Sequence, residues 1–347
     1  MSTTSTDRNV SESTHPFDDS DADLIVQSSD RKRFCVYRKI LAKASPVFKD
    51  MFQLPPVPQD DALVQLQVAE DGDPDIIDGI HVVRVTENGR ELENFLRLLD
   101  PLYPPNDLPL DDILRLLDAC RKYQLHVIPP QLMGRLRRRM NRDPWRVLCI
   151  AEAFGMDDLV RDVAQSFLRH NILPLGTMPP ELGRLSGPAI WKILNFHGDC
   201  AKVAASIVEM NTASNWVLTG VGDRSVNTQL FNRNLINSTP AWIWFRCTSC
   251  PASNNTVIHC AVGRASGNFT PRDWWKEYMD RILYRVNNRP LGFDPRETEL
   301  LEPSLRKAAS CSTCGPEAFK DLMQFGRILA DRIVQAVSKI QLELPLC

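Results

Sequence analysis

Cysteine spacing is the clearest chemical pattern in the 347-residue chain. Two CxxC units, CTSC at residues 247–250 and CSTC at residues 311–314, are separated by residues 251–310. A CxxC turn directs two thiolates toward one ion, with zinc–sulfur bonds of about 2.3 Å, and two such turns complete a tetrahedral structural zinc site. A redox dithiol and buried free thiols are the competing interpretations, but two pairs near a predicted strand end and a helix start favour metal. We therefore predict a structural zinc site with the ligands Cys247, Cys250, Cys311 and Cys314, and with His197, Cys200, His259 and Cys260 as spare candidates.

Motifs of enzymes are missing from the sequence. It contains no GxxxxGK[ST] phosphate-binding loop, no GxGxxG turn and no HExxH zinc motif. Ser266 lies one position away from the place that a GxSxG nucleophile elbow requires. We expect a non-enzymatic protein. A hydrolase built on a C-terminal cysteine stays open as a weaker alternative, because a catalytic Cys and His meet only in the fold.

The composition is that of an ordinary globular protein, with 43% hydrophobic residues, 24% charged residues and a net charge of −2. Such a balance creates no overall field toward nucleic acid or anionic lipid. No apolar run approaches the length of a membrane span, and the polar residues 1–15 lack the apolar core of a secretory signal. We expect an intracellular protein, cytoplasmic or nuclear, with reduced cysteines and no membrane contact.

The N-terminal third alternates strand and helix signals. Residues 24–26 and 34–37 are predicted to be short strands around a Ser-Ser-Asp turn. Ser45 and Pro46 combine an N-cap hydroxyl with a proline at the first helical position, which predicts a helix. A strand at residues 82–85 and helices with apolar residues at 92–99 and 113–120 follow. The pattern predicts an α+β domain.

The remainder is predicted to be mainly helical. Asp143-Pro144 and Asp157 begin two amphipathic helices, and a Pro/Gly-rich join at residues 173–188 leads to a helical stretch around Cys200. In the last third we expect a strand at residues 242–245, a helix that begins at Thr270-Pro271 and a final helix. The predicted apolar stripe of this final helix comprises Phe319, Leu322, Met323, Gly326, Ile333, Val337 and Ile340.

Shifts in composition suggest the domain boundaries. The polar residues 1–16 are expected to be disordered. Residues 50–80 hold eight acidic side chains and neither Lys nor Arg, so we expect an exposed acidic insertion at about residues 55–80, with room for an edge strand at 63–68. The predicted domains are residues 17–128 with this insertion, a helical extension at 129–210, and a mixed C-terminal domain at 211–347 that carries both CxxC units.

Taken together, the N-terminal segments resemble a BTB/POZ domain. The resemblance is carried by DADLIV at residues 21–26, by SPVFKDMF at residues 45–52, and by ACRKYQL at residues 119–125, which is similar to the helix that usually closes the domain. Tyr37 departs from the pattern, because many family members have His there. The whole layout is similar to the large fungal branch of the family. The resemblance implies an α/β BTB/POZ fold, followed here by mainly α-helical regions, that dimerises and docks partner proteins.

The resemblance also implies residues and partners. In the family, an Asp at the start of the first strand and a basic residue after the hairpin lie near the dimer interface, and Asp23 and Arg38 match these positions. The two helices after Pro144 resemble the start of the BACK-like extension of adaptors for cullin ubiquitin ligases. We therefore predict a homodimeric interaction adaptor whose further partners are a cullin scaffold and a substrate protein.

A basic run supports an alternative function. Six arginines lie between residues 135 and 146, against the single acid Asp143. A nuclear transcription or chromatin regulator would use the Arg135–Arg142 patch on nucleic acid. A solvated helix face in a nearly neutral protein explains the same run, and we favour that interpretation.

Overall fold

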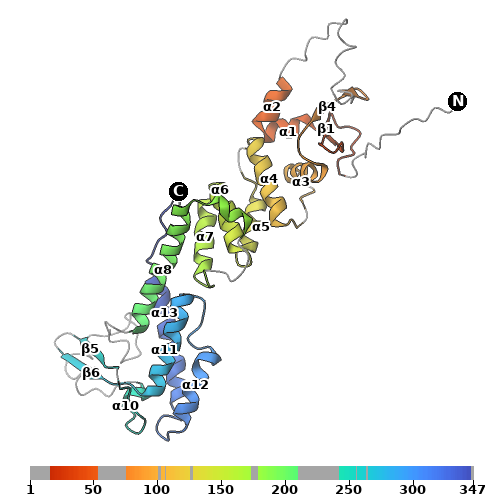
Figure 1. Ribbon diagram of the computed structural model, residues 1–347. Coiled ribbons are helices and arrows are strands. Elements are labelled where there is room, and N and C mark those ends of the chain that lie inside the picture. The colour runs from red at the N-terminus through yellow and green to blue at the C-terminus, as the bar shows by residue number, and fades with distance from the viewer. Residues whose placement is uncertain are drawn as a thin grey trace, which may run out of the picture. The chain divides into compact units, whose positions relative to one another are not determined.

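The computed structural model describes residues 16–53, 76–100, 103–105, 107–125, 128–172, 179–209, 242–254, 256–262 and 265–344. The chain divides into two compact units, residues 1–138 and 139–347 (Figure 1). The predicted N-terminal disorder falls almost wholly outside the described residues, as does the acidic insertion up to residue 75.

The N-terminal unit contains a small mixed sheet in the order β2-β1-β4-β3. Strand β1 (Leu24–Gln27) pairs antiparallel with β2 (Arg33–Val36) and parallel with β4 (Ile80–Arg84), while β3 (Ile76–Ile77) pairs antiparallel with β4. All four residues of β1 are buried, which fits the central place of this strand. The strands predicted at residues 24–26, 34–37 and 82–85 are confirmed, and the end of the acidic stretch forms the edge strand β3.

Five helices accompany this sheet: α1 (Arg38–Ala44), α2 (Pro46–Gln53), α3 (Gly89–Leu99), α4 (Leu110–Lys122) and α5 (Pro130–Arg139). A capping box between Asn88 and Glu91 begins α3. The buried ring of Tyr123 lies 4.7 Å from that of Phe48 and 5.1 Å from that of Phe95, measured between centroids. These rings join α2, α3 and the end of α4 in one core.

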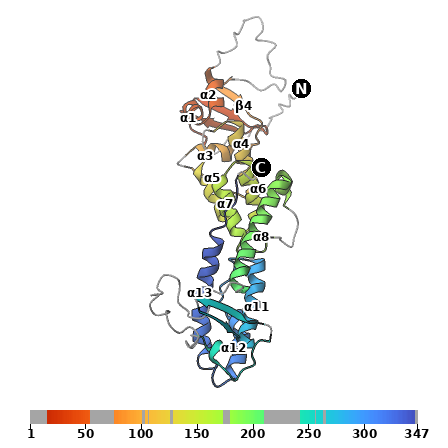
Figure 2. The same ribbon diagram turned by 90° about the vertical axis from the view of Figure 1, so that its left-hand side faces the viewer.

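The C-terminal unit is mainly helical. It begins with α6 (Pro144–Ala153), α7 (Asp157–Phe167) and the 3₁₀ turn η1 (Pro180–Arg184). The long helix α8 (Gly187–Glu209) packs against both α11 (Asp273–Asn288) and α13 (Ala318–Val337), and Figure 2 shows the three helices side by side. Helix α12 (Thr298–Ala309), the short helix α10 (Ile243–Arg246) and a hairpin of β5 (Ile258–Val262) and β6 (Ala265–Phe269) complete the described part.

Two predictions for this unit were wrong. Residues 242–245 do not form a strand, because Ile243–Arg246 is the single-turn helix α10. The predicted stripe of the final helix was partly misplaced: Phe319 is 59% exposed, whereas Phe325 and Leu329 lie on the buried face. None of the helices in the described ranges is long and apolar enough to cross a membrane.

Candidate functional site: a four-cysteine cluster and a groove on the N-terminal unit

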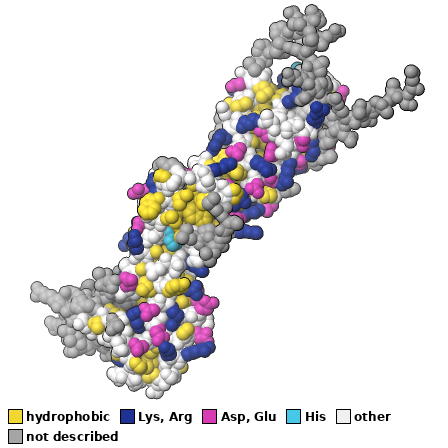
Figure 3. Space-filling view, viewed as in Figure 1, with side chains coloured by type: hydrophobic (Ala, Val, Ile, Leu, Met, Phe, Trp, Pro, Cys, Tyr) yellow, Lys and Arg dark blue, Asp and Glu magenta, His cyan; other side chains and the backbone are white. Residues whose placement is uncertain are grey.

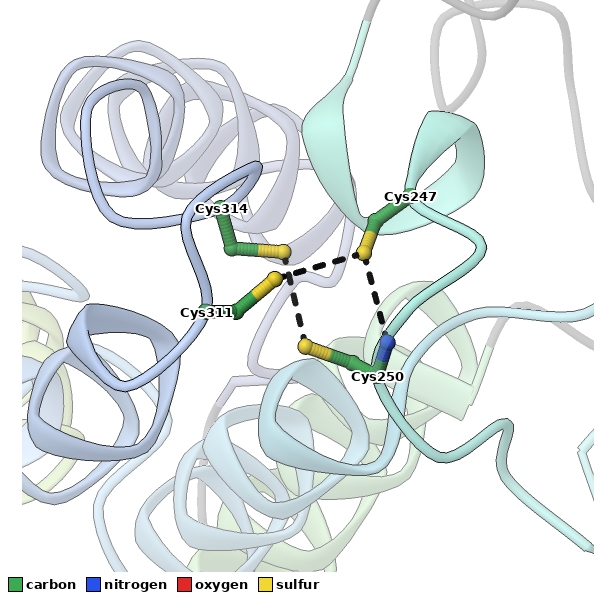
Figure 4. A group of neighbouring side chains, drawn as sticks. All are labelled: Cys247, Cys250, Cys311 and Cys314. Carbon is green, nitrogen blue, oxygen red and sulfur yellow. Dashed lines mark hydrogen bonds between the residues drawn. The ribbon is translucent and has the colours of Figure 1, made fainter.

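The four predicted cysteines come together in the C-terminal unit (Figure 4). Cys247 ends α10 and Cys250 lies in the loop after it, whereas Cys311 and Cys314 lie in the turn between α12 and α13. Their Sγ atoms all lie within 4.8 Å of one another and point toward a common centre. All four are free thiols, so the cluster is one of potential ligands and not of disulfides.

The sulfur separations match those of a metal tetrahedron. Sγ of Cys247 lies 3.8 Å from Sγ of Cys311, and Sγ of Cys250 lies 3.7 Å from Sγ of Cys314. In a regular tetrahedron with zinc–sulfur bonds of about 2.3 Å, the sulfur atoms are about 3.8 Å apart. These two separations fit a bound zinc ion, and the remaining sulfur pairs lie within 4.8 Å of one another.

Backbone N–H groups donate hydrogen bonds to two of the sulfur atoms and so stabilise negative charge on them. The N–H of Cys250 donates to Sγ of Cys247 at 3.4 Å, and N–H groups of Cys314 and Thr313 donate to Sγ of Cys311. These last bonds lower the pKa of Cys311 to about 6, while burial raises the pKa of Cys250 to about 11 and also raises that of Cys314. Four thiolates so close together repel one another, so full deprotonation of the cluster requires a bound cation.

Exposure differs within the cluster. Cys247 and Cys314 are fully buried, whereas Cys250 and Cys311 are partly exposed. An ion at the centre would have four protein ligands and no position left for a water molecule. That arrangement is typical of structural and not of catalytic zinc sites.

Contacts around the cluster tie α10 to α13. The buried carboxylate of Asp321 accepts a hydrogen bond from the backbone N–H of Ile243 at 2.8 Å, and Arg246 pairs with Glu317 at 2.5 Å. Burial raises the pKa of Asp321. Neither contact was predicted, because each joins residues more than 70 positions apart in the sequence.

An aromatic core surrounds the same helix. The ring of Trp244 stacks on Trp242 at 5.1 Å and on Trp275 at 5.4 Å, and meets Phe325 edge-on at 5.3 Å. Trp244 is fully buried. The two indoles of α10 and its border therefore fill the space between α11 and α13.

The spare ligand candidates lie elsewhere. His197 and Cys200 are buried on α8 and are not members of the cluster. Among the described residues, Nε2 of His197 has no hydrogen-bond partner, and burial lowers the pKa of this side chain. His259 and Cys260 lie on β5, where the side chains are outside the description.

Asp23 and Arg38 meet in the N-terminal unit, but not as a charge pair. The carboxylate of Asp23 accepts a hydrogen bond from the backbone N–H of Arg38 at 2.7 Å, at the start of α1. The guanidinium of Arg38 instead lies 5.5 Å from the ring centroid of Phe52. Asp23 is exposed in the single chain, and its place at a dimer interface stays a prediction.

A groove of about 760 Å³ opens beside α1. Its apolar lining comes from the chain before β1, from β2, α1 and α3, and includes Phe17, Val36, Ile40, Leu41, Leu96 and Leu99. Asp18, Asp19 and Asp100 add negative charge, and the Tyr37 hydroxyl donates a hydrogen bond to Asp19, which raises the pKa of Tyr37 to about 12. Ile40 is 47% exposed. Sequence periodicity could not identify the groove. The groove is formed by single apolar residues that remain exposed, and the exposure of one residue does not follow from a periodic pattern.

The opposite face of α1 is basic. A second hollow there is lined by Lys39, Lys43 and Lys49, together with Ala42, Pro46 and Asp50. All three lysines are exposed. Helix α1 therefore separates an acidic apolar groove from a basic one.

The arginines of the basic run have structural contacts. Arg135 donates to the carbonyl of Pro105 at 2.5 Å, and Arg146 forms an ion pair with the buried carboxylate of Glu181. On the face shown in Figure 3, basic and acidic side chains are intermixed over the described residues. At least two of the six arginines thus have roles within the fold.

Comparison with protein families identifies the N-terminal unit. Residues 15–136 match the family model of the BTB/POZ domain, which covers the mixed sheet and helices α1 to α4. The search of curated proteins found no match to the chain. With its fold and its family match in agreement, the segment at residues 15–136 is a BTB/POZ domain, as the sequence motifs predicted.

Proposed function

We propose that this protein is a non-enzymatic adaptor that joins proteins through its BTB/POZ domain. The observation that carries the proposal is the match of residues 15–136 to a family of interaction modules. The apolar groove beside α1 supports it, because exposed apolar surface with a polar rim is typical of a docking site.

We propose self-association as the first interaction, through the surface around α1. The acidic groove on one face of this helix and the lysine-lined hollow on the other are complementary in charge, so two copies can each supply what the other lacks. Asp23, directly before β1, and Arg38, the first residue of α1, remain proposed interface residues. Light scattering of the full chain at micromolar concentration tests this: a dimer mass is expected, and a stable monomer contradicts it.

We propose a cullin scaffold as the second partner, with a substrate protein bound elsewhere on the chain. The helical pair α6 and α7, which follows the BTB/POZ domain in sequence, supports this step by resemblance alone. Titration of the purified chain with the N-terminal region of a cullin provides the test. Saturable binding is expected, and the lack of binding by a chain that still forms dimers would remove the cullin and leave the adaptor.

We also propose one structural zinc ion per chain as the cofactor, held by Cys247, Cys250, Cys311 and Cys314. The sulfur separations of 3.7 and 3.8 Å support this ion. Elemental analysis of the purified protein should find about one zinc per chain.

A further inference from the structure

We infer that zinc fixes the tryptophan-bearing helix α10 in the core, so that the C-terminal unit completes its fold around the ion while the BTB/POZ domain folds without it. The inference rests on the zinc site proposed above and assigns that ion a specific task. It starts from the weakness of α10, because a helix of four residues cannot hold its own conformation.

Besides the packing of the Trp244 ring and the hydrogen bond from the N–H of Arg272 to the Trp244 carbonyl, three polar contacts among the described residues join α10 to α13 and the turn before it. The cysteine cluster is the strongest candidate among these three. The Arg246–Glu317 pair is partly exposed and therefore weak. Asp321 supplies one hydrogen bond to Ile243. Cys247, the residue that ends α10, enters the four-thiol cluster. With zinc bound, this third contact becomes a set of metal–thiolate bonds.

The metal–thiolate bonds would stabilise the aromatic core, because the cysteine cluster lies close to it in the sequence. Cys247 is three residues from Trp244, whose ring touches Trp242, Trp275 and Phe325. On the other side of the cluster, Cys314 is followed after three residues by α13, which carries Phe325. The ion therefore joins the two segments whose aromatic side chains pack together.

Loss of the ion would weaken the attachment of α10 to the core. Without the ion, the four sulfur atoms, which lie within 4.8 Å of one another, would no longer be bonded to a common centre. The loop of residues 251–310 would lose its closure, and the binding free energy that contributes to folding would be lost. We expect α10 to leave the core and expose Trp242 and Trp244 to water.

Tryptophan fluorescence reports on this unit alone. All seven tryptophans follow residue 138, and four of them, at positions 242, 244, 274 and 275, are buried around α10. The experiment treats the full chain with a strong zinc chelator and records zinc content, tryptophan emission and peptide-resolved hydrogen exchange on the same sample. A red shift of emission and faster exchange in α10 and α13 are expected, with exchange in residues 16–53 unchanged.

Matched variants separate the ion from the loss of a buried thiol. Cys314→Ser removes a proposed ligand, whereas Cys200→Ser makes the same chemical change at an equally buried thiol on α8. Cys314→Ser should show the emission of the chelated wild type and no further change with chelator, and Cys200→Ser should retain zinc and respond like the wild type. If Cys314→Ser does not fold, the emission and hydrogen exchange of the chelated wild type still test the inference.

The results of these measurements distinguish a failure of the inference about α10 from a failure of the proposed zinc site. The chain could contain one zinc ion whose removal changes neither the tryptophan emission nor the hydrogen exchange. That result would overturn the inference but would still support the zinc site. A chain without zinc and with slow exchange in α10 would overturn both. Restoration of the original emission when zinc is added back completes the expected result.

Discussion

Ser45 joins the start of α2 to the end of α4 in the BTB/POZ domain. It is fully buried between α1 and α2, accepts a hydrogen bond from the N–H of Phe48 at 3.2 Å and donates to the carbonyl of Tyr123 at 2.5 Å. Ser45→Ala leaves the carbonyl and the N–H without their partner, so the free energy of unfolding should fall by about 1–3 kcal/mol. Urea denaturation measures this, with the exposed Ser29→Ala as the control. Equal stability of the two variants would contradict the assigned role.

The sequence predicted the four cysteines as one group, whereas the place of Asp23 and Arg38 at an interface stays a prediction. CxxC spacing reports a local geometry, and the structure confirms that both pairs meet in one cluster. Within one chain, the carboxylate of Asp23 accepts a hydrogen bond from the backbone N–H of Arg38. Side-chain charges are visible in a sequence, whereas the backbone N–H groups at the start of a helix are not.

Among the elements, the sequence predicted those whose stability is local. The Ser-Pro start of α2 and the apolar periodicity of α3 and α4 all depend on neighbouring residues. The sequence Trp-Ile-Trp-Phe favours a strand by propensity, but Asp321 and the packing of both indoles make it a helix turn. Helix α12 contains Pro303, and nearby the Leu300 carbonyl accepts hydrogen bonds from Arg281 at 3.0 and 3.1 Å. Such contacts cannot be derived from periodicity.

The contact between α10 and α13 should depend on pH through Asp321. Burial raises the pKa of this carboxyl in the folded state, so folding favours its protonated form, and the contribution of the group to stability falls as pH rises through that raised value. The free energy of unfolding of the wild type minus that of Asp321→Asn should therefore increase as pH falls from neutral toward about 4. Parallel curves for the two proteins over this range, from denaturant titrations at fixed zinc, would contradict the role of burial.

The acidic segment gives a second test of the elements. Its charge and prolines predict that a short Gly/Ser linker can replace residues 56–74 with little change in melting temperature, because the entropy of loop closure grows slowly with length. Extension of the replacement to Asp78 also removes β3, which pairs with β4. The longer deletion should lower the melting temperature more than the shorter one. A collapse of folding in the shorter deletion would show that the segment contributes to the core.

The whole molecule combines a BTB/POZ domain without tryptophan and a mainly helical unit that carries a four-cysteine cluster. The first unit is proposed to bring copies of the chain together and the second to carry a metal. These roles are independent. Loss of zinc should leave dimers intact, and loss of the dimer should leave zinc bound, which elemental analysis of the variants below can check.

Self-association through the surface around α1 can be measured as the mass of the chain in solution, before and after that surface is changed. Ile40→Glu places a charge on the 47% exposed Ile40 in the groove, whereas Val334→Glu makes a comparable change at a 53% exposed valine of α13. Sedimentation equilibrium of the full chain should give twice the chain mass of 39.3 kDa for the wild type and for Val334→Glu. Ile40→Glu should dissociate at least tenfold more readily, which corresponds to about 1.4 kcal/mol of association free energy. A monomeric wild type, or an Ile40→Glu variant that associates as tightly as Val334→Glu, would contradict the account.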